Sequence, residues 1–434
     1  MKKDIQNRLR KLGVVKGSRK LKPAPKVVPP PLSRVDYLAE RDRVDEPRLL
    51  ADLPPGGQVV ETAVGGCYVL DKVYPLSYQH GDDTLQDLLA HSPHIAAVFS
   101  KDVQLQDLHF QDFLFIDTET TGLAGAGTLA FMVGVAFFEK QAAFDDLVLV
   151  VRQYFLRDHG DEAAMLTLLE ELLAHKTGLI SFNGRSFDLP LLDGRYLMNR
   201  MMNPMLGMPH IDLLPPARRL WRKRLDSCAL SALEPNLLGV HRTHEDVPGW
   251  LIPSLYHNYL RSGNAQELMR VFYHNQLDMV SMVTLAARIM RLFDQPNAED
   301  DPIDLFSLGK WQADLGLTAV AEQNLRLAVA GDLPLTHFHE ALYRLGALLK
   351  RNGRRAEAVP LWQQIAATSF DDVTAHVELA KQYEWHEKSL PKATEWTQEA
   401  LNLSQSWGRR GESMQAELEH RLNRLKRKQS TSNP

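Results

Sequence analysis

The sequence predicts an α/β fold in which a mixed sheet is flanked by helices, followed by an all-α repeat domain. Three observations support this class. Strand-like runs rich in Val and Phe alternate with helical periodicity from about residue 111 to residue 296. Small and aromatic residues then recur at a spacing of 34 positions after residue 303. The 434 residues are enough for two or three domains, at about 150 residues per domain.

The composition excludes several classes of protein. Hydrophobic residues make up 44% and charged residues 24% of the chain, as in ordinary globular proteins. The two cysteines, Cys67 and Cys228, are too few for a disulfide-built secreted protein or a four-thiolate zinc site. The longest apolar run, 129–138, is shorter than the about 20 residues that cross a bilayer. We therefore expect a cytoplasmic protein without a secretory signal or a membrane partner.

The charges are distributed unevenly along the chain. The net charge is −4, yet residues 1–35 contain eleven Lys or Arg and one acid, so the remaining residues carry −14. Five prolines between residues 23 and 31 disfavour a helix, and residues 1–36 are expected to form a disordered basic tail. Such a tail can neutralise nucleic-acid phosphates, but a solvated leader explains its composition equally well.

The α/β domain is expected over residues 37–296, and each of its elements follows from a local pattern. Residues 37–110 form a lead-in with a strand-like run at 58–62 and a turn signal at Gly65-Gly66. Later strands are expected at 113–116, 130–138, 147–155, 178–182 and 210–214. Helices are expected at 161–175, from about residue 187, and through most of 215–294.

The all-α domain is expected over residues 303–428, after an acidic linker that ends at Pro302. Gly346 and Trp362 fit a helix–turn–helix unit of the tetratricopeptide type, and Ala380 lies 34 positions after Gly346 in the next unit. Small residues let paired helices approach each other, while large residues fill the groove between units. An unrelated helical bundle is the alternative. A last helix, 412–428, ends in several cations.

Four acids that lie far apart in the sequence carry the chemical information. Asp117 and Glu119 follow the 113–116 strand, and side chains at i and i+2 of a strand point to the same face. Asp188 lies where a strand is followed by a turn and a helix, and Asp278 lies on an expected helix. Together these positions predict a cluster of carboxylates at one edge of the sheet.

Such a cluster is suited to divalent cations. Carboxylate oxygens are hard ligands for Mg²⁺ or Mn²⁺, and clustered carboxylates repel one another unless a cation lies among them. Two ions about 3.5–4 Å apart stabilise the attacking and leaving oxygens of a phosphodiester displacement. We therefore expect Asp117, Glu119, Asp188 and Asp278 to bind two Mg²⁺ or Mn²⁺ ions, with Asp117 between the ions if its strand is central.

These motifs resemble a known superfamily. Asp-x-Glu-Thr-Thr-Gly at 117–122, Asn-x-x-x-Phe-Asp at 183–188 and the later Asp278 are similar to the three exonuclease motifs of the DEDD superfamily. Residues from about 60 to 295 also resemble the YprB-like ribonuclease H-like domain, in stretches such as 123–128, 210–214, 228–234 and 274–278. The resemblance implies a ribonuclease H-like fold, a metal-dependent 3′–5′ exonuclease acting on nucleic acid, and tetratricopeptide-like repeats after the domain.

One position departs from the DEDD pattern. DEDD exonucleases usually place a Tyr four residues, or a His five residues, before the last Asp, where it orients or deprotonates the attacking water. Here His274 lies four residues and Tyr273 five residues before Asp278. Positions i and i+4 share a helix face, and an unperturbed imidazole pKa of about 6.5 suits a base, so His274 is assigned this catalytic role. Tyr273 is the alternative if the helix begins too late.

The sequence favours a 3′–5′ exonuclease acting on single-stranded DNA or RNA, with a possible protein partner bound by the repeats. A structure-specific endonuclease and a non-catalytic adaptor are the alternatives. A run of cations at 218–224 is either a phosphate-binding surface or a solvated helix face. Asn183 is expected to be a turn residue, and Asp212 is expected to order the chain that enters the next helix.

Overall fold

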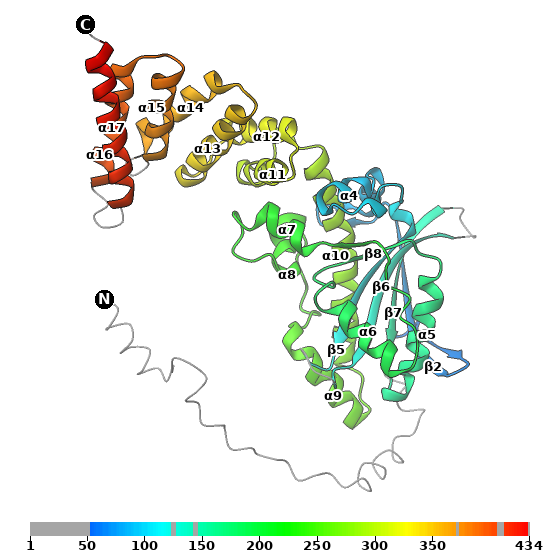
Figure 1. Ribbon diagram of the computed structural model, residues 1–434. Coiled ribbons are helices and arrows are strands. Elements are labelled where there is room, and N and C mark those ends of the chain that lie inside the picture. The colour runs from blue at the N-terminus through cyan, green and yellow to red at the C-terminus, as the bar shows by residue number, and fades with distance from the viewer. Residues whose placement is uncertain (1–52, 123–126, 142–145, 370–372, 406–411, 433–434) are drawn as a thin grey trace, which may run out of the picture. The chain divides into compact units, whose positions relative to one another are not determined.

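A seven-stranded mixed sheet forms the centre of the α/β part of the molecule (Figure 1). The computed structural model describes residues 53–122, 127–141, 146–369, 373–405 and 412–432. The basic tail at 1–36 and most of the glycine-rich stretch 123–128 lie outside these residues. The strand order in the sheet is β1-β2-β7-β6-β5-β8-β9. The strands are β1 (Gln58–Thr62), β2 (Gly65–Pro75), β5 (Phe113–Thr120), β6 (Ala130–Gln141), β7 (Asp146–Phe155), β8 (Gly178–Ser181) and β9 (His210–Asp212).

The pairing of the strands confirms the predicted mixed sheet. Strands β1, β2, β7, β6 and β5 pair antiparallel in that order, whereas β8 pairs parallel to β5 and β9 pairs parallel to β8. The short strands β3 (Gln79–His80) and β4 (Asp83–Thr84) pair separately. In β6, the residues from Ala130 to Phe138 are all buried, as expected for a strand covered on both faces.

Strand β5 is longer than the sequence predicts. It continues past Ile116 to Thr120, because Asp117 pairs with Gly134 and Glu119 pairs with Met132 of β6. The two acids therefore lie within a strand and not after it, which corrects the expected boundary. Their i and i+2 spacing still places both carboxylates on one face, and the strand is flanked by β6 and β8 on its two sides.

Helices surround the sheet and connect its strands. They are α4 (His94–Ser100), α5 (Glu162–Leu173), α6 (Asp188–Met198), α7 (Leu214–Trp221), α8 (Leu230–Leu233), α9 (Ile252–Ser262) and α10 (Leu268–Asp294). The long helix α10 contacts β5, β6 and β7, while α5 contacts β1 and β2. A single π-helical turn, Glu234–Leu238, follows α8. None of the described helices combines the length and the apolar character needed to span a bilayer.

In the described part of the C-terminal region there are seven further helices, in agreement with the predicted fold class. They are α11 (Pro302–Asp314), α12 (Thr318–Ala330), α13 (Leu335–Arg351), α14 (Arg355–Thr368), α15 (Val373–Trp385), α16 (Leu390–Gln405) and α17 (Glu412–Ser432). The most extensive contacts join α11 to α12, α13 to α14, α15 to α16 and α16 to α17. Glycine permits this close approach in α13, since a Cβ on Gly346 would lie 2.8 Å from Nε1 of Trp362.

Helix α11 starts at a strong sequence signal and packs on the α/β core. Asp301 caps it by accepting a hydrogen bond from the amide of Ile303 at 2.8 Å, and Pro302 occupies the first turn. Its Trp311 ring lies 5.2 Å from that of Phe99 in α4 and 5.0 Å from that of Phe293 in α10. The domain boundary at residues 297–302 remains a prediction from the sequence. The packing of Trp311 on Phe99 and Phe293 joins the helices on its two sides.

Candidate active site

The structure brings the four predicted acids together. Asp117 and Glu119 project from β5, Asp188 is the first residue of α6, and Asp278 lies in the middle of α10. Burial raises the pKa of Asp117 well above its usual range, and the nearby charges of Asp188 and Asp278 raise it further. The pKa of Glu119 is raised in the same way, by burial and then by the other three carboxylates. The four acids therefore repel one another in a poorly solvated place.

Asp188 is held by the strand that lies beside it. Only 3% of this residue is exposed, and its carboxylate accepts a hydrogen bond from the hydroxyl of Thr118 in β5. Burial raises the pKa of Asp188 to about 6, while the Thr118 hydrogen bond lowers it in part. Its position in the first turn of α6 also exposes the carboxylate to the positive end of the helix dipole.

Asn275 of α10 positions Asp117 through a hydrogen bond. Its Nδ2 donates to Oδ2 of Asp117 at 3.2 Å, and its Oδ1 accepts from Nε2 of Gln153 at 3.0 Å. Asn275 is fully buried, and a Cβ on Gly134 would lie only 2.1 Å from its Oδ1. A glycine in β6 is therefore required for α10 to lie close enough to the sheet for this contact.

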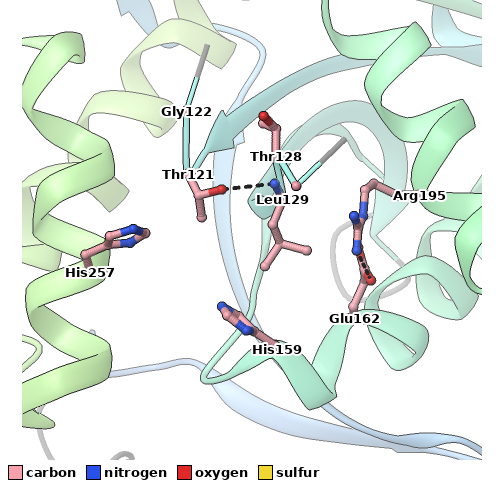
Figure 2. A pocket seen from close by; sticks show the side chains of 9 residues that line it. Thr121, Gly122, Thr128, Leu129, His159, Glu162, Arg195 and His257 are labelled. Atoms are coloured by element: carbon pink, nitrogen blue, oxygen red, sulfur yellow. Dashed lines mark hydrogen bonds and ion pairs between the residues drawn. The ribbon is translucent and has the colours of Figure 1, made fainter. Parts of the chain in front are cut away.

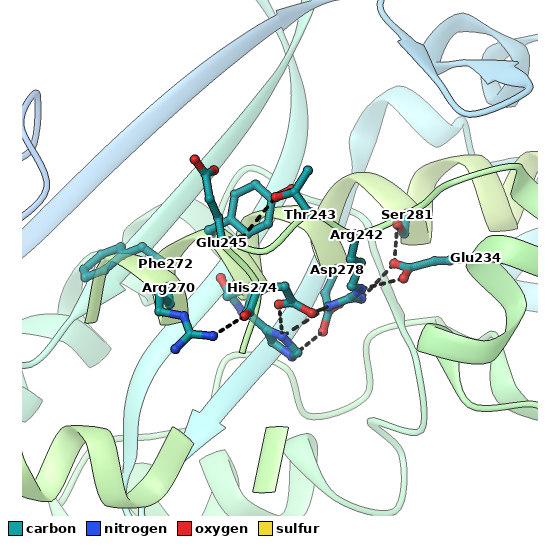
Figure 3. A network of polar contacts seen from close by, with 12 residues as sticks. Glu234, Arg242, Thr243, Glu245, Arg270, Phe272, His274, Asp278 and Ser281 are labelled. Carbon is teal, nitrogen blue, oxygen red and sulfur yellow. Dashed lines mark hydrogen bonds and ion pairs between the residues drawn. The ribbon is translucent and has the colours of Figure 1, made fainter. Parts of the chain in front are cut away.

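Arg242 links Asp278 to a buried glutamate (Figure 3). Its Nε and Nη2 donate to Glu234 at 2.5 and 2.7 Å, and Nη2 also donates to Asp278. Glu234 is fully buried, and the hydroxyl of Ser281 donates to its Oε1 at 2.7 Å. Burial raises the pKa of Glu234, and its hydrogen bond with Arg242 counteracts part of that rise. The guanidinium is thus fixed by Glu234 and directed at one oxygen of Asp278.

His274 lies on the face of α10 that the sequence predicts. Its Nε2 is 3.5 Å from Oδ2 of Asp278, and its Nδ1 is 2.7 Å from Oδ1 of Asp246 (Figure 3). Tyr273 instead accepts a hydrogen bond from the hydroxyl of Thr243 at 3.2 Å. Helix α10 begins well before both residues, so the continuous helix that the assignment of His274 requires is present.

The loop before α6 also has its expected form. Asn183 has a φ of 66°, in the left-handed region typical of a turn residue. Asp212 accepts hydrogen bonds from the amides of Asn183 at 2.8 Å, Arg185 at 3.2 Å and Leu214 at 3.1 Å. Asp212 thereby orders both the loop that leads to Asp188 and the start of α7, which confirms the structural role expected for it.

A cavity of about 480 Å³ opens beside the end of β5 (Figure 2). Thr121 and Gly122, which follow the strand directly, line one side. The ion pair between Glu162 and Arg195, with Nε and Oε1 2.5 Å apart, lines another part. His159 and His257 also line this cavity, and Figure 2 shows their rings as two further polar groups on its wall. An opening therefore exists next to the strand that carries Asp117 and Glu119.

The four carboxylates are chemically suited to divalent cations. Their oxygens are hard ligands, and among the described residues their ion pairs are those of Arg242 and His274 with Asp278. The pKa values of Asp117 and Glu119 are raised first by burial and then by the neighbouring carboxylates, so ionisation of these acids is unfavourable unless a cation lies beside them. No three described His, Cys, Asp or Glu side chains already form a metal-binding group. Rotation of side chains, including that of Asp278 away from Arg242, would be needed for binding.

Sequence reasoning did not identify four of the polar residues around the acids. They are Glu234, Arg242, Asp246 and Asn275. Asn275 lies next to His274, and Glu234 lies in the 228–234 stretch that resembles the YprB-like domain, so local signals existed for these two. Arg242 and Asp246 lie in an irregular loop, 239–248, without periodicity or a motif, and only the folded chain brings them to α10.

Comparisons with known proteins agree with this geometry. Residues 114–290 match a family model described as RNase_H superfamily, and this range contains all four acids and His274. The chain is also similar to YprB of Bacillus subtilis (strain 168), which is described as an uncharacterized protein. The identity is 29% over 376 residues, which cover 84% of this chain and 87% of YprB. Residues 114–290 are therefore similar to the RNase H superfamily, and this similarity points to a nuclease or phosphodiesterase.

Proposed function

We propose that this protein is a nuclease dependent on Mg²⁺ or Mn²⁺ that hydrolyses phosphodiester bonds of single-stranded nucleic acid from the 3′ end. The convergence of Asp117, Glu119, Asp188 and Asp278 from three separate elements carries the proposal. A partly buried group of mutually repelling carboxylates is costly for a fold to keep. A function that uses their charge explains why it is present.

In this proposal the same four residues hold two divalent ions. Asp117 lies on the strand between β6 and β8, with Asn275 fixing its orientation, and would help to hold both ions. Glu119, Asp188 and Asp278 complete the two sets of ligands. When bound, the ions stabilise the negative charge that develops on the attacking and leaving oxygens of the phosphodiester.

His274 is the proposed base. Nδ1 of His274 lies 2.7 Å from Asp246 and 3.1 Å from Nη1 of Arg242. In this proposal Arg242 moves away when the site is occupied. The Nδ1 proton is then directed at Asp246, and Nε2 accepts a proton from the attacking water. Asp246 acts as a positioning residue, since it fixes the tautomer and the ring orientation without touching the substrate. Tyr273 is bound to Thr243 and takes no part.

The C-terminal helices are proposed to be tetratricopeptide-like repeats that bind a protein partner. Their pairwise packing and the contact of Gly346 with Trp362 support this reading. The cavity beside β5 supports entry of a substrate end near Asp117 and Glu119.

Digestion of 5′-end-labelled single-stranded DNA and RNA with Mg²⁺, Mn²⁺ or EDTA tests the proposed activity. We expect metal-dependent shortening from the 3′ end and no cleavage of circular single strands. Asp117→Asn should lower the rate at least about a thousandfold, since it removes the shared ligand. Asp112→Asn, at an exposed acid just before the strand, should cleave like the wild type.

Two other outcomes would replace the proposal. Cleavage of circular substrates would indicate an endonuclease. Binding of oligonucleotides without cleavage in either metal would indicate a non-catalytic adaptor.

A further inference from the structure

A second cavity, of about 370 Å³, lies between α7 and α11, and none of the four acids lines it. Five cations line this cavity against a single carboxylate, that of Asp314. The cations are Arg218, Arg219, Arg222, Lys223 and Lys310. Such an excess of positive charge in a concave site attracts anions and raises their local concentration.

The cations of α7 are the ones available to a ligand. Lys223 and Lys310 both contact Glu340, at 2.9 and 3.1 Å, so their charge is partly neutralised. Among the described residues, no ion pair involves Arg218 or Arg222. Both arginines are exposed, and their i and i+4 spacing places them on the same side of α7. Two guanidinium groups therefore face the cavity without a protein partner.

Ser307 in α11 provides a second and independent observation. It lines the same cavity, it is 3% exposed, and its hydroxyl has no hydrogen-bond partner among the described residues. A buried hydroxyl without a partner destabilises a fold, so it is a candidate donor to a group that the protein does not itself supply. Phosphate oxygens accept hydrogen bonds from hydroxyl and guanidinium groups alike.

The two walls of the cavity are held in place. Asp304 of α11 accepts a hydrogen bond from Nε1 of Trp221 at 3.1 Å and two from Arg224 at 2.9 and 2.8 Å. Further along α11, Trp311 packs against Phe99 and Phe293. Arginines and serine therefore face each other across a fixed gap, which is what a preorganised binding site needs.

We propose that this cavity binds the phosphate backbone of the single-stranded nucleic acid that the nuclease cleaves. The identity of the ligand rests on the proposed function. Arg218 and Arg222 contact phosphates, and the hydroxyl of Ser307 donates to a phosphate oxygen. Helix α7 starts directly after Asp212, which orders the loop leading to Asp188, so the same segment connects the acids and this cavity. The two arginines lie roughly 6 and 12 Å along α7 from its start.

Fluorescence anisotropy with a fluorescein-labelled single-stranded oligonucleotide, in EDTA, tests this site without cleavage. We expect Arg218→Gln/Arg222→Gln to weaken affinity about tenfold and to reduce the slope of log Kd against log salt by about 1.4, since each lost phosphate contact accounts for about 0.7. Lys140→Gln/Arg351→Gln removes the same charge from exposed positions elsewhere and should change affinity less than about twofold.

Ser307→Ala separates a binding role from a structural one. Removal of a buried hydroxyl without a partner should leave Tm unchanged or raise it, whereas loss of a phosphate contact should weaken oligonucleotide binding about threefold. The proposal is overturned if both double variants lose affinity equally, or if neither does. A third outcome also overturns it: inorganic phosphate raises the Tm of the wild type, but Arg218→Gln/Arg222→Gln leaves oligonucleotide affinity unchanged. The cavity would then bind free phosphate and not the nucleic-acid backbone.

The two proposals can fail separately. A wild-type protein that binds the oligonucleotide through Arg218 and Arg222, yet does not cleave it with Mg²⁺ or Mn²⁺, retains this site and loses the nuclease activity. A protein that cleaves short substrates normally in the double variant, with unchanged affinity for long ones, retains the activity and loses this site.

Discussion

At the residue scale, the site depends on the contacts that two residues of an irregular loop make with α10. Arg242 contacts one oxygen of Asp278, and Asp246 contacts Nδ1 of His274. The arginine supplies positive charge to the last of the four acids, while the aspartate fixes the orientation of the His274 ring. Both are anchored by further contacts, since Glu234 holds Arg242 and the carbonyl of Asp246 accepts from Nη2 of Arg270 at 2.6 Å.

The role of Asp246 leads to a prediction about the rate of cleavage. Asp246→Asn should lower kcat about 10–100-fold with little change in KM, because the ring of His274 loses the carboxylate that fixes its tautomer. Measurement of kcat and KM for wild type and variant checks this effect.

Tyr273→Phe is the matched test of the alternative base. Its hydroxyl contacts Thr243 and not Asp278, so the variant should retain kcat within about twofold. A large loss in Tyr273→Phe together with an unchanged Asp246→Asn would transfer the role from His274 to Tyr273.

At the scale of elements, the closeness of α10 to the sheet determines the geometry. Gly134 in β6 makes room for Asn275, which in turn contacts Asp117. The hairpin of β3 and β4 supports α10 elsewhere, where His80 lies 2.8 Å from the hydroxyl of Ser281. Ser281 also donates to Glu234, so this support reaches the Arg242 network.

Gly134→Ala should damage both stability and activity. Its Cβ would overlap the amide of Asn275, and overpacking of this kind costs about 1–3 kcal/mol. Urea unfolding measures the loss, and the cleavage rate should fall because Asn275 no longer orients Asp117. Gly194→Ala, in α6 with open space around it, should be neutral or stabilise by up to about 1 kcal/mol. Equal effects of the two substitutions would contradict the proposed close contact.

His80 should make stability depend on pH. Burial, and to a smaller extent the charge of Arg242, lower its pKa from 6.5 to about 4, so as the pH falls the unfolded chain binds a proton before the folded chain does. Its contribution to stability is therefore complete above about pH 6.5 and is lost as the pH falls toward 4. The loss amounts to up to about 3 kcal/mol. His80→Gln should show a smaller fall in unfolding free energy over this range, and an identical fall would refute the assignment.

Local patterns in the sequence were sufficient for the acids and for six strands, β1 and β5 to β9, but β2 was not predicted, and Gly65-Gly66, expected as a turn, begins that strand. Runs of Val, Phe and Ile marked the strands, and the i and i+2 spacing of Asp117 and Glu119 and the i and i+4 spacing of His274 and Asp278 set which side chains share a face. The end of β5 was missed, because its last residues are polar and their strand conformation depends on pairing with β6. The contacts of Arg242 and Asp246 were missed because they are tertiary.

At the scale of the whole molecule, α11 belongs to the packing of the α/β core as well as to the helical region. Leu308 and Trp311 share a hydrophobic core with Phe293 of α10. The acidic run that the sequence predicts to be a linker is attached to α10, because Arg291 donates two hydrogen bonds to Asp300, at 2.9 and 2.5 Å. The walls of the basic cavity are therefore part of one packed structure.

Trp311→Ala should show how much this packing contributes. It removes a 4% exposed ring from contact with two aromatic partners, and such substitutions cost about 3–5 kcal/mol. Trp250→Ala, at an 81% exposed ring, should change stability by less than about 0.5 kcal/mol. Denaturant unfolding compares the two variants, and a small effect of Trp311→Ala would show that α11 is only loosely attached.

Anomalous diffraction from crystals grown with Mn²⁺ tests the central claim most directly. We expect manganese peaks coordinated by Asp117 and shared among Glu119, Asp188 and Asp278, with the contact between Arg242 and Asp278 opened. A structure with no manganese at these carboxylates, and with Arg242 still bound to Asp278, would contradict the account.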